Sequence, residues 1–500
     1  SVSIGVNGKL KFTGQIQVNF IENILKKQFL AGDVLADWFD ILIHSLCSGI
    51  IMEHVTCRVC QVSALINCEG SSYHIASLKS RYKDKRERLL VSHELANVLV
   101  DVCQEEILEY QGSNCSHNVL LECLRCIRNL CAECPLAQNI VLSNVALTCS
   151  IKQLMKSDVA DGVISAAILQ LLWNISNSDV SIKLSVWKTF HFELCNSIIL
   201  GNDPAAEVAL MTVSSIVEEI KMDANNIVVH PQFSAIFKKL LHLIASDNHH
   251  SLSLMQSLLA HTDCLVKVWQ TISVTDVQLL SEVVTTNLDK KCNLISKSNV
   301  SNLVFNFKNL CEEFVKAVSE NSSLEVLIPL VDLTQMLSDL STNDIINTIL
   351  QEDPEFFIKT TLLLKTVHLA GKSGNIMFSH ARNIQIFEKQ MKGDKSILDD
   401  PVYGFKKDLI RLIANLLHQS VTNQDNLREM ECIPLILDCC SVDAKNPFII
   451  QWTILAIRNM MERNPTNQSI LSTLSRKGQI DTSSLEAAGV SILGNKVVFS

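Results

Sequence analysis

The sequence is poor in turn-forming residues: only 16 of its 500 residues are glycine and 9 are proline. Average globular proteins contain roughly 7% glycine and 5% proline. A chain this poor in both has little material for the many tight turns of all-β folds or for glycine-rich nucleotide-binding loops. Aromatic residues are also scarce, at 5%, although 47% of the chain is hydrophobic. The hydrophobic content is therefore mostly aliphatic, which favours an α-helical protein.

The chain also lacks an excess of positive charge. It has 43 Lys and Arg against 52 Asp and Glu, for a net charge of −9. We therefore expect no general attraction to nucleic acid or to anionic membranes. No stretch reaches the roughly 20 apolar residues of a membrane span, and residues 1–17 lack the apolar core of a secretory signal. These features predict a soluble cytoplasmic protein with no nucleic-acid partner and no membrane insertion.

The 18 cysteines are too few for a disulfide scaffold, in which roughly 8–10% of residues are cysteine. We interpret them as free thiols in a reducing compartment. The densest group is Cys123, Cys126, Cys131 and Cys134. Four converging thiolates would suit zinc, but this segment has the pattern of one helix, so buried structural cysteines are the favoured interpretation. A metal or redox protein that uses Cys123–Cys134 stays open as an alternative.

Signatures of enzymatic sites are missing from the sequence. It contains no phosphate loop, nucleophile elbow, kinase signature or dinucleotide-binding fingerprint. We therefore expect a protein that is not an enzyme and that uses no cofactor. The one basic cluster, 79–88, has six cations and two acids. We interpret it as a solvated segment between helices, with a nuclear-import signal or a phosphate-binding patch as the alternatives.

A repeat of about 44 residues is the strongest pattern that is present. Asn415 precedes an Asn-Gln pair by eight residues, and Asn459 has the same arrangement 44 residues later. Two earlier copies surround Asn129 and Asn174, which are 45 residues apart. Armadillo and HEAT arrays have periods of roughly 40–47 residues. The period therefore predicts stacked helical repeats.

The last full repeat predicts three helices. Thr422 or Asn423 can cap a short helix over 424–431, and Pro434 can open a second. Asn446-Pro447 again combines a capping residue with a proline, and we expect this pair to open a longer third helix. The order short, short, long is that of armadillo repeats rather than of two-helix HEAT repeats. The apolar positions of the third helix recur at spacings of three and four; they are Phe448, Ile449, Trp452, Leu455, Ala456 and Met460.

The predicted fold class is therefore all-α, an armadillo-like helical repeat solenoid (α-α superhelix). The pairs Asn7-Gly8 and Gly494-Asn495 stand between short apolar segments and predict a β-hairpin at one or both ends. A stretch rich in Gly, Ser and Asp separates two arrays. The predicted parts are an N-terminal extension (1–14), an N-terminal array (15–370), an irregular linker (371–402), C-terminal repeats (403–478) and a C-terminal tail (479–500).

The repeated asparagine of the third helices is the main candidate for partner binding. In armadillo arrays the third helices line one concave face, and an amide there can both donate to and accept from an extended peptide. The four candidates are Asn129, Asn174, Asn415 and Asn459. An interpretation of equal weight is that these side chains tie neighbouring repeats together.

An importin-like adaptor for basic peptides is a second alternative. Importin-like grooves place Trp one turn before the asparagine. Here those four positions hold Arg125, Gln170, Arg411 and Leu455. The missing tryptophans argue against such an adaptor.

Four cations give positive charge to the C-terminal repeats of an otherwise acidic protein. They are Lys406, Lys407, Arg411 and Arg458. We predict that they select an acidic surface on a partner protein.

Three segments carry a family resemblance: Tyr403-Gly-Phe-Lys-Lys-Asp-Leu-Ile-Arg-Leu-Ile-Ala-Asn415, Ile433-Pro-Leu-Ile-Leu-Asp438 and Ala456-Ile-Arg-Asn459. Together they closely resemble the C-terminal domain of the ataxin-10 family. The resemblance is densest over 400–475. It implies a non-enzymatic, cytoplasmic armadillo protein whose C-terminal domain self-associates into a homo-oligomer. It also implies roles in neuron survival, neurite outgrowth, cytokinesis and the base of the cilium. The partners that it implies are the O-GlcNAc transferase, a G-protein β subunit and a ciliary nephrocystin.

Overall fold

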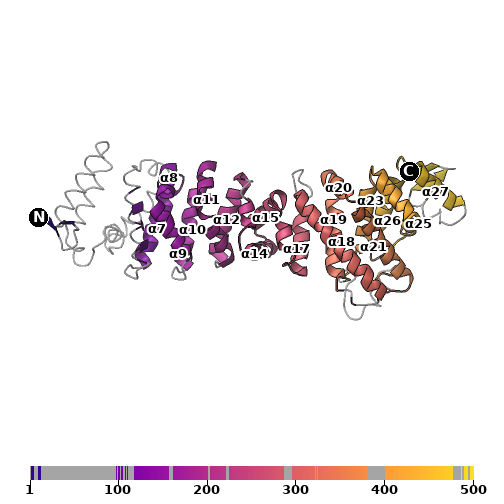
Figure 1. The fold of residues 1–500 in the computed structure, drawn as a ribbon, viewed down its shortest axis with the longest axis horizontal. Helices are drawn as coiled ribbons and strands as arrows, with labels where there is room; N and C mark the ends of the chain where they lie inside the picture. The colour runs from indigo at the N-terminus through magenta and orange to yellow at the C-terminus, as the bar shows by residue number, and fades with distance from the viewer. Residues whose placement is uncertain are drawn as a thin grey trace. The chain divides into compact units, whose positions relative to one another are not determined.

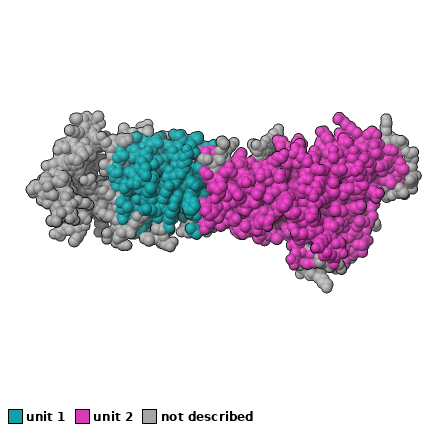
Figure 2. Space-filling model, viewed as in Figure 1, with its two compact units in different colours: residues 1–219 teal, residues 220–500 magenta. Residues whose placement is uncertain are grey.

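The computed structural model of the chain is helical, with a short β-hairpin near each end (Figure 1). It describes residues 2–4, 10–12, eight positions between 97 and 110, and 117–156, 162–200, 203–220, 224–285, 295–320, 323, 325–380, 400–476, 486, 489–493 and 496–499. The basic cluster 79–88 lies outside these residues. The chain forms two compact units, 1–219 and 220–500 (Figure 2).

The first unit is built from helices that stack on their neighbours. Helices α8, α9 and α10 have 9, 12 and 15 residues and follow one another in armadillo order. Helix α10 packs beside α7, which precedes this repeat. The helices of this part are α7 (His117–Cys131), α8 (Pro135–Ser143), α9 (Val145–Lys156), α10 (Gly162–Ser176), α11 (Val180–Leu200) and α12 (Asp203–Ile220).

The apolar spacing of α7 explains its packing. Leu120, Leu124, Ile127 and Cys131 follow one another at intervals of four, three and four residues, and each is at most 1% exposed. This interval places them on one side of the helix, and burial of that apolar side stabilises the packing of α7 on its neighbours α10 and α8. Because Cys131 is a member of this buried row, its thiol acts as a small apolar group.

The second unit continues with helices of less regular length and ends in the repeats that the sequence predicted. Helices α19, α23 and α26 pack side by side in that order. No helix in the described part of the chain is both long and apolar enough to cross a lipid bilayer. The helices are α13 (Asn225–Val228), α14 (Phe233–Ala245), α15 (His249–His261), α16 (Cys264–Val268), α17 (Val274–Thr285), α18 (Lys297–Glu320), α19 (Leu327–Leu340), α20 (Asp344–Gln351), α21 (Pro354–Lys372), α23 (Phe405–Leu417), α24 (Val421–Glu429), α25 (Ile433–Asp438), α26 (Ile449–Met461) and α27 (Pro465–Arg476).

The three helices predicted for the last repeat are confirmed as α24, α25 and α26, with 9, 6 and 13 residues. The predicted cap of the first one is wrong. Ser420 caps α24, and its side chain accepts a hydrogen bond from the Asn423 amide. Ser420 has the extended backbone of an N-cap residue, whereas Thr422 and Asn423 are already helical.

The predicted role of Asn446 is also wrong. Its Oδ1 accepts a hydrogen bond of 3.0 Å from the amide of Lys407, in the first turn of α23. Gly404, the N-cap of α23, has a φ of 79° and donates its amide to the Lys445 carbonyl at 2.8 Å. Asn446 therefore caps the neighbouring third helix rather than its own.

Phe448 does not belong to the buried stripe in which the sequence placed it. Its side chain is 70% exposed, whereas Ile449, Ala456 and Met460 are at most 3% exposed. Phe448 is the N-cap of α26, with a φ of 63°, and this left-handed conformation turns it out of the helical period.

Both predicted hairpins are present. Strand β1 (Val2–Ile4) pairs with β2 (Leu10–Phe12), and β3 (Val490–Leu493) pairs with β4 (Lys496–Phe499), both antiparallel. Strand β4 also packs against α27. An isolated two-stranded hairpin is marginally stable in water, so contact with a helix supports the C-terminal one. The sequence-based boundaries around 371–402 stay a prediction, because 381–399 lie outside the described part.

Candidate partner-binding face of the repeats

Two of the repeated asparagines tie neighbouring third helices together in the same way. Asn459 on α26 donates from Nδ2 to the Ala414 carbonyl of α23 at 2.8 Å. Asn174 on α10 donates from Nδ2 to the Arg128 carbonyl of α7 at 2.8 Å. In both cases the acceptor stands one residue before the asparagine of the preceding repeat. These donors therefore serve the stack rather than a bound peptide.

A glutamine nine residues after the asparagine completes the tie, and sequence reasoning noted it only as part of the period. Gln424 donates from Nε2 to the Asn459 carbonyl at 2.8 Å, across to the next repeat. Gln138 likewise donates to the carbonyl of Cys131 at 2.8 Å and of Asn174 at 3.2 Å. Both glutamines are at most 1% exposed. They satisfy carbonyls at the ends of third helices, which have no partner within the helix.

The other two candidate asparagines have different contacts. Asn415 donates from Nδ2 to Ser341 Oγ, 2.9 Å away at the end of α19, and its carbonyl accepts from Asn347 at 3.0 Å. Asn129 Oδ1 accepts hydrogen bonds of 3.1 and 3.0 Å from the guanidinium of Arg128. The four asparagines thus share positions in their repeats but not one common set of partners.

Arg411 on α23 lies between its two neighbouring helices. Its guanidinium pairs with Asp339 at the end of α19 and lies 4.9 Å from the ring centre of Trp452 on α26. The Arg411 side chain is 18% exposed and that of Asp339 13%. An ion pair this shielded, with a cation–π contact, links three helices. Sequence reasoning found Arg411 but not Asp339 or Trp452, which are distant along the chain.

Lys406 belongs to a polar cluster around the buried side chain of His368. Its Nζ donates to Nδ1 of His368 at 3.0 Å, and His368 Nε2 faces Asp438 Oδ2 at 3.4 Å. The His368 side chain is 7% exposed. Burial, helped by the charges of Lys406 and Lys372, lowers the pKa of His368 to about 4. The imidazole is therefore neutral at physiological pH.

The remaining two cations differ in exposure. Lys407 pairs with the adjacent Asp408 at 2.9 Å and is 24% exposed. Arg458, on α26, is exposed. Of the four predicted cations, Arg458 is therefore the one best placed to meet a partner.

Asp332 on α19 is a further polar group that sequence reasoning did not select. Burial raises the pKa of its carboxyl to about 6. Its Oδ2 is buried, and no donor among the described residues makes a hydrogen bond to it.

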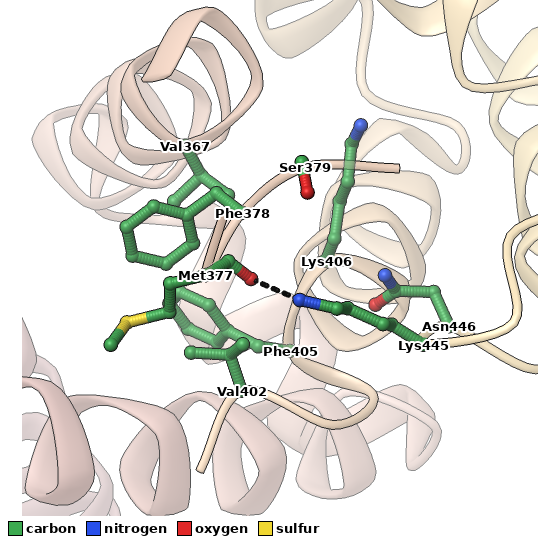
Figure 3. A pocket seen from close by; sticks show the side chains of 9 residues that line it. All are labelled: Val367, Met377, Phe378, Ser379, Val402, Phe405, Lys406, Lys445 and Asn446. Atoms are coloured by element: carbon green, nitrogen blue, oxygen red, sulfur yellow. Dashed lines mark hydrogen bonds between the residues drawn. The ribbon is translucent and has the colours of Figure 1, made fainter. Parts of the chain in front are cut away.

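A small hollow lies where the loops before α23 and α26 meet the end of α21 (Figure 3). It has room for about one water, with a volume of about 10 Å³. Lys445 crosses it and donates to the carbonyls of Ile376 at 2.9 Å and Met377 at 2.8 Å. Its Nζ is also 3.4 Å from Asp400 Oδ2. Lys445 therefore links the loop after α21 to the loop before α26, and the space that remains is too small for a substrate.

The cysteine group occupies the end of α7 and the residue before α8. Cys123, Cys131 and Cys134 are at most 8% exposed, and burial raises the pKa of Cys131. The described residues include no group of three His, Cys, Asp or Glu side chains arranged to hold a metal ion. A thiol whose proton is held this firmly is a poor metal ligand or nucleophile.

Comparisons with known proteins point to one family. Residues 405–496 match the model of the spinocerebellar ataxia type 10 protein domain, which is named for homo-association. The chain is 26% identical to ataxin-10 of Bos taurus, over 85% of this chain and 93% of that protein. It is 25% identical to ataxin-10 of Homo sapiens, over 84% and 91%. The ataxin-10 homolog of Dictyostelium discoideum is 37% identical over 20% of this chain and 17% of that protein.

One solved structure concerns the interaction between cadherin and beta-catenin. It aligns with 92% of this chain and 92% of its own, at 12% identity and a TM-score of 0.30.

Proposed function

Because the chain belongs to the ataxin-10 family, we propose that it is a non-enzymatic armadillo scaffold. It binds partner proteins along the face of its third helices and self-associates through 403–478. Stacked repeats present a long, semi-rigid surface that suits this role. The observation that carries the proposal is the row α19, α23 and α26, whose helices are tied by Asn459, Asn415 and Arg411.

The partly exposed side chains on this row suit protein recognition. Trp452 is partly exposed and its ring lies against Arg411, while Arg458 is exposed six residues further along α26. Tryptophan and arginine are enriched among residues that dominate binding energies. We propose that Arg458, supported by Lys406, Lys407 and Arg411, favours an acidic partner segment.

Charge reversal tests the acidic-partner proposal. Arg458→Glu should weaken binding of a labelled poly-glutamate peptide by about fivefold, measured by fluorescence anisotropy, without loss of helicity. Arg411→Asp alone would place its new carboxylate against that of Asp339 and so disturb the fold. The double variant Arg411→Asp/Asp339→Arg keeps an ion pair between the two positions but moves the positive charge from α23 to α19. Wild-type binding by Arg458→Glu, or equal binding of a poly-lysine peptide by the parent chain, would contradict the proposal. The second result would favour an importin-like adaptor.

Self-association and the cellular roles are tested separately. We propose that the chain forms a homo-oligomer in the cytoplasm and acts in neurite outgrowth, neuron survival, cytokinesis and at the base of the cilium. We further propose the O-GlcNAc transferase, a G-protein β subunit and a ciliary nephrocystin as partners. Crosslinking with mass spectrometry from native cell extract should recover these proteins and copies of the chain itself. Recovery of neither class would refute this part of the proposal.

A further inference from the structure

We infer that a second copy of this chain docks on an apolar edge of the C-terminal repeats formed by Ile376, Val442 and Phe448. We call these three residues the Phe448 edge. The inference rests on the self-association proposed above and names the surface that carries it. Phe448 is the anchor of this contact.

The Phe448 edge exposes large apolar side chains on loops that are bound to one another. Its three side chains are 71%, 66% and 70% exposed, three of the four highest values among the large hydrophobic side chains described in 325–476. Lys445 donates to the Ile376 carbonyl at 2.9 Å, and Ser441 Oγ lies 3.2 Å from His380 Nε2. These bonds hold the loop after α21 against the loop before α26. Exposed apolar side chains that gather on adjoining loops mark a candidate protein interface.

The backbone of Phe448 is unusual for an apolar residue. It has a φ of 63° and a ψ of 13° at the start of α26. A bulky residue rarely adopts this left-handed conformation. The other described non-glycine residues with positive φ are polar, and each stands two residues past the end of a helix, where this conformation is common. They are Glu133, Asp247, Gln419, Glu431 and Arg463.

The neighbouring residues explain why this conformation falls on Phe448. Asn446 is engaged with Lys407 at the start of α23, and Pro447 has no amide hydrogen. The cap position of α26 is thereby left to Phe448, where glycine would fit with less strain. An exposed phenyl group buries little apolar surface within the single chain, whereas a contact with another molecule would bury it.

A second copy is the occupant that fits best. Val442 and Phe448 lie within 405–496, the part that matches the domain named for homo-association. A symmetric contact places the same surface on both sides, so it favours an apolar edge without excess charge of one sign. Charged side chains near these loops in the sequence form ion pairs, Lys372 with Asp438 and Lys445 with Asp400.

Sedimentation velocity of the purified full-length chain over a concentration series tests the inference. Phe448→Asp should raise the dissociation constant of self-association by at least about tenfold. Ile345→Asp is the matched control, since Ile345 is 68% exposed in the same unit but lies away from these loops, on α20. It should leave the constant within about twofold. Phe448→Gly should also abolish association, yet keep Tm within about 2 °C of the parent or raise it, because glycine relieves the backbone strain.

The outcomes separate the inference from the function on which it rests. A parent chain that associates, with Phe448→Asp and Phe448→Gly associating equally well, would overturn the Phe448 edge and leave self-association standing. A parent chain that stays monomeric would overturn both. A Tm loss of many degrees in Phe448→Gly would show that the phenyl group supports the fold, which would overturn its role as an anchor.

Discussion

At the scale of single residues, the repeated asparagine shows how one amide can define a repeat. Asn459 and Asn174 reach equivalent backbone carbonyls of the preceding third helix, in different units of the chain. A backbone carbonyl is present whatever the side chain at that position. The tie made by these two asparagines therefore tolerates a change of side chain at the acceptor position, which is Ala414 in one case and Arg128 in the other.

We predict that Asn459→Ala lowers the free energy of unfolding by about 1–2 kcal/mol. Asn459 is 4% exposed, so its removal deletes a buried hydrogen bond and leaves the Ala414 carbonyl without this donor. Chemical denaturation followed by circular dichroism measures the change. The adjacent exposed residue supplies the control, because Arg458→Ala should change stability by less than about 0.5 kcal/mol. Equal effects of the two variants would contradict the assignment.

We predict that His368 makes the fold less stable in mild acid. Its pKa is lowered to about 4 in the folded chain, below the usual value of 6.5, so the unfolded chain takes up the proton more readily between these values. Stability is therefore full above about pH 6.5 and falls as the pH drops toward 4. The loss should be about 1–2 kcal/mol, since partial solvent screening reduces the effect.

Denaturation curves between pH 4 and pH 7.5 test the His368 prediction. His368→Gln should flatten the pH dependence, whereas His261→Gln should leave it unchanged because His261 is exposed. A parent-like pH profile in His368→Gln would show that other groups cause the acid sensitivity.

At the scale of helices, the loop of one repeat caps a helix of the preceding repeat. The loop 443–446 supplies Asn446 Oδ1 and the Lys445 carbonyl to the start of α23. Other helices, such as α20 and α21, are capped by the residue directly before them, Asn343 and Asp353. The start of α23 thus depends on a loop about 40 residues away, and this dependence couples the folding of adjacent repeats.

We predict that Asn446→Ala weakens the first turn of α23 rather than that of α26. The amide of Lys407 loses its acceptor, so its hydrogen exchange should accelerate, with a stability loss of about 1 kcal/mol. Asn343→Ala is the control, because it should accelerate exchange at Ile345 and Ile346 within its own helix. Faster exchange confined to α26 in Asn446→Ala would contradict the assignment.

At the scale of the whole molecule, each repeat contacts mainly its neighbours. Helix α10 packs on α7 in the first unit, and α23 packs between α19 and α26 in the second. In such arrays the stability is close to a sum of local terms. A defect in one repeat should therefore stay near it.

We predict that Asn174→Ala and Asn459→Ala perturb different parts of the chain. Asn174→Ala should accelerate hydrogen exchange in α7 and α10 and leave α23 and α26 at parent rates, since its partner is Arg128. Asn459→Ala should give the reverse pattern. Hydrogen exchange with mass spectrometry on the full chain measures both. A uniform increase in either variant would show one global folding unit and refute the local picture.

The residue pattern alone predicts an all-α chain, the position of the last repeat, the order of its helices and the two hairpins. These features follow from local rules: apolar period, proline positions and turn pairs, all of which act within about ten residues. The resemblance to the ataxin-10 family over 400–475 also follows from the sequence.

The contact partners of the candidate side chains follow from the three-dimensional packing of the repeats. Asp339 and Trp452 surround Arg411 from 72 and 41 residues away along the chain, and Asn446 caps a helix that precedes it. Phe448 fits an apolar period, yet a single left-handed backbone angle turns it to the surface. Periodicity reports the side of a helix on which a residue stands. It does not report which distant atom meets that side, because stacking of the repeats determines such contacts.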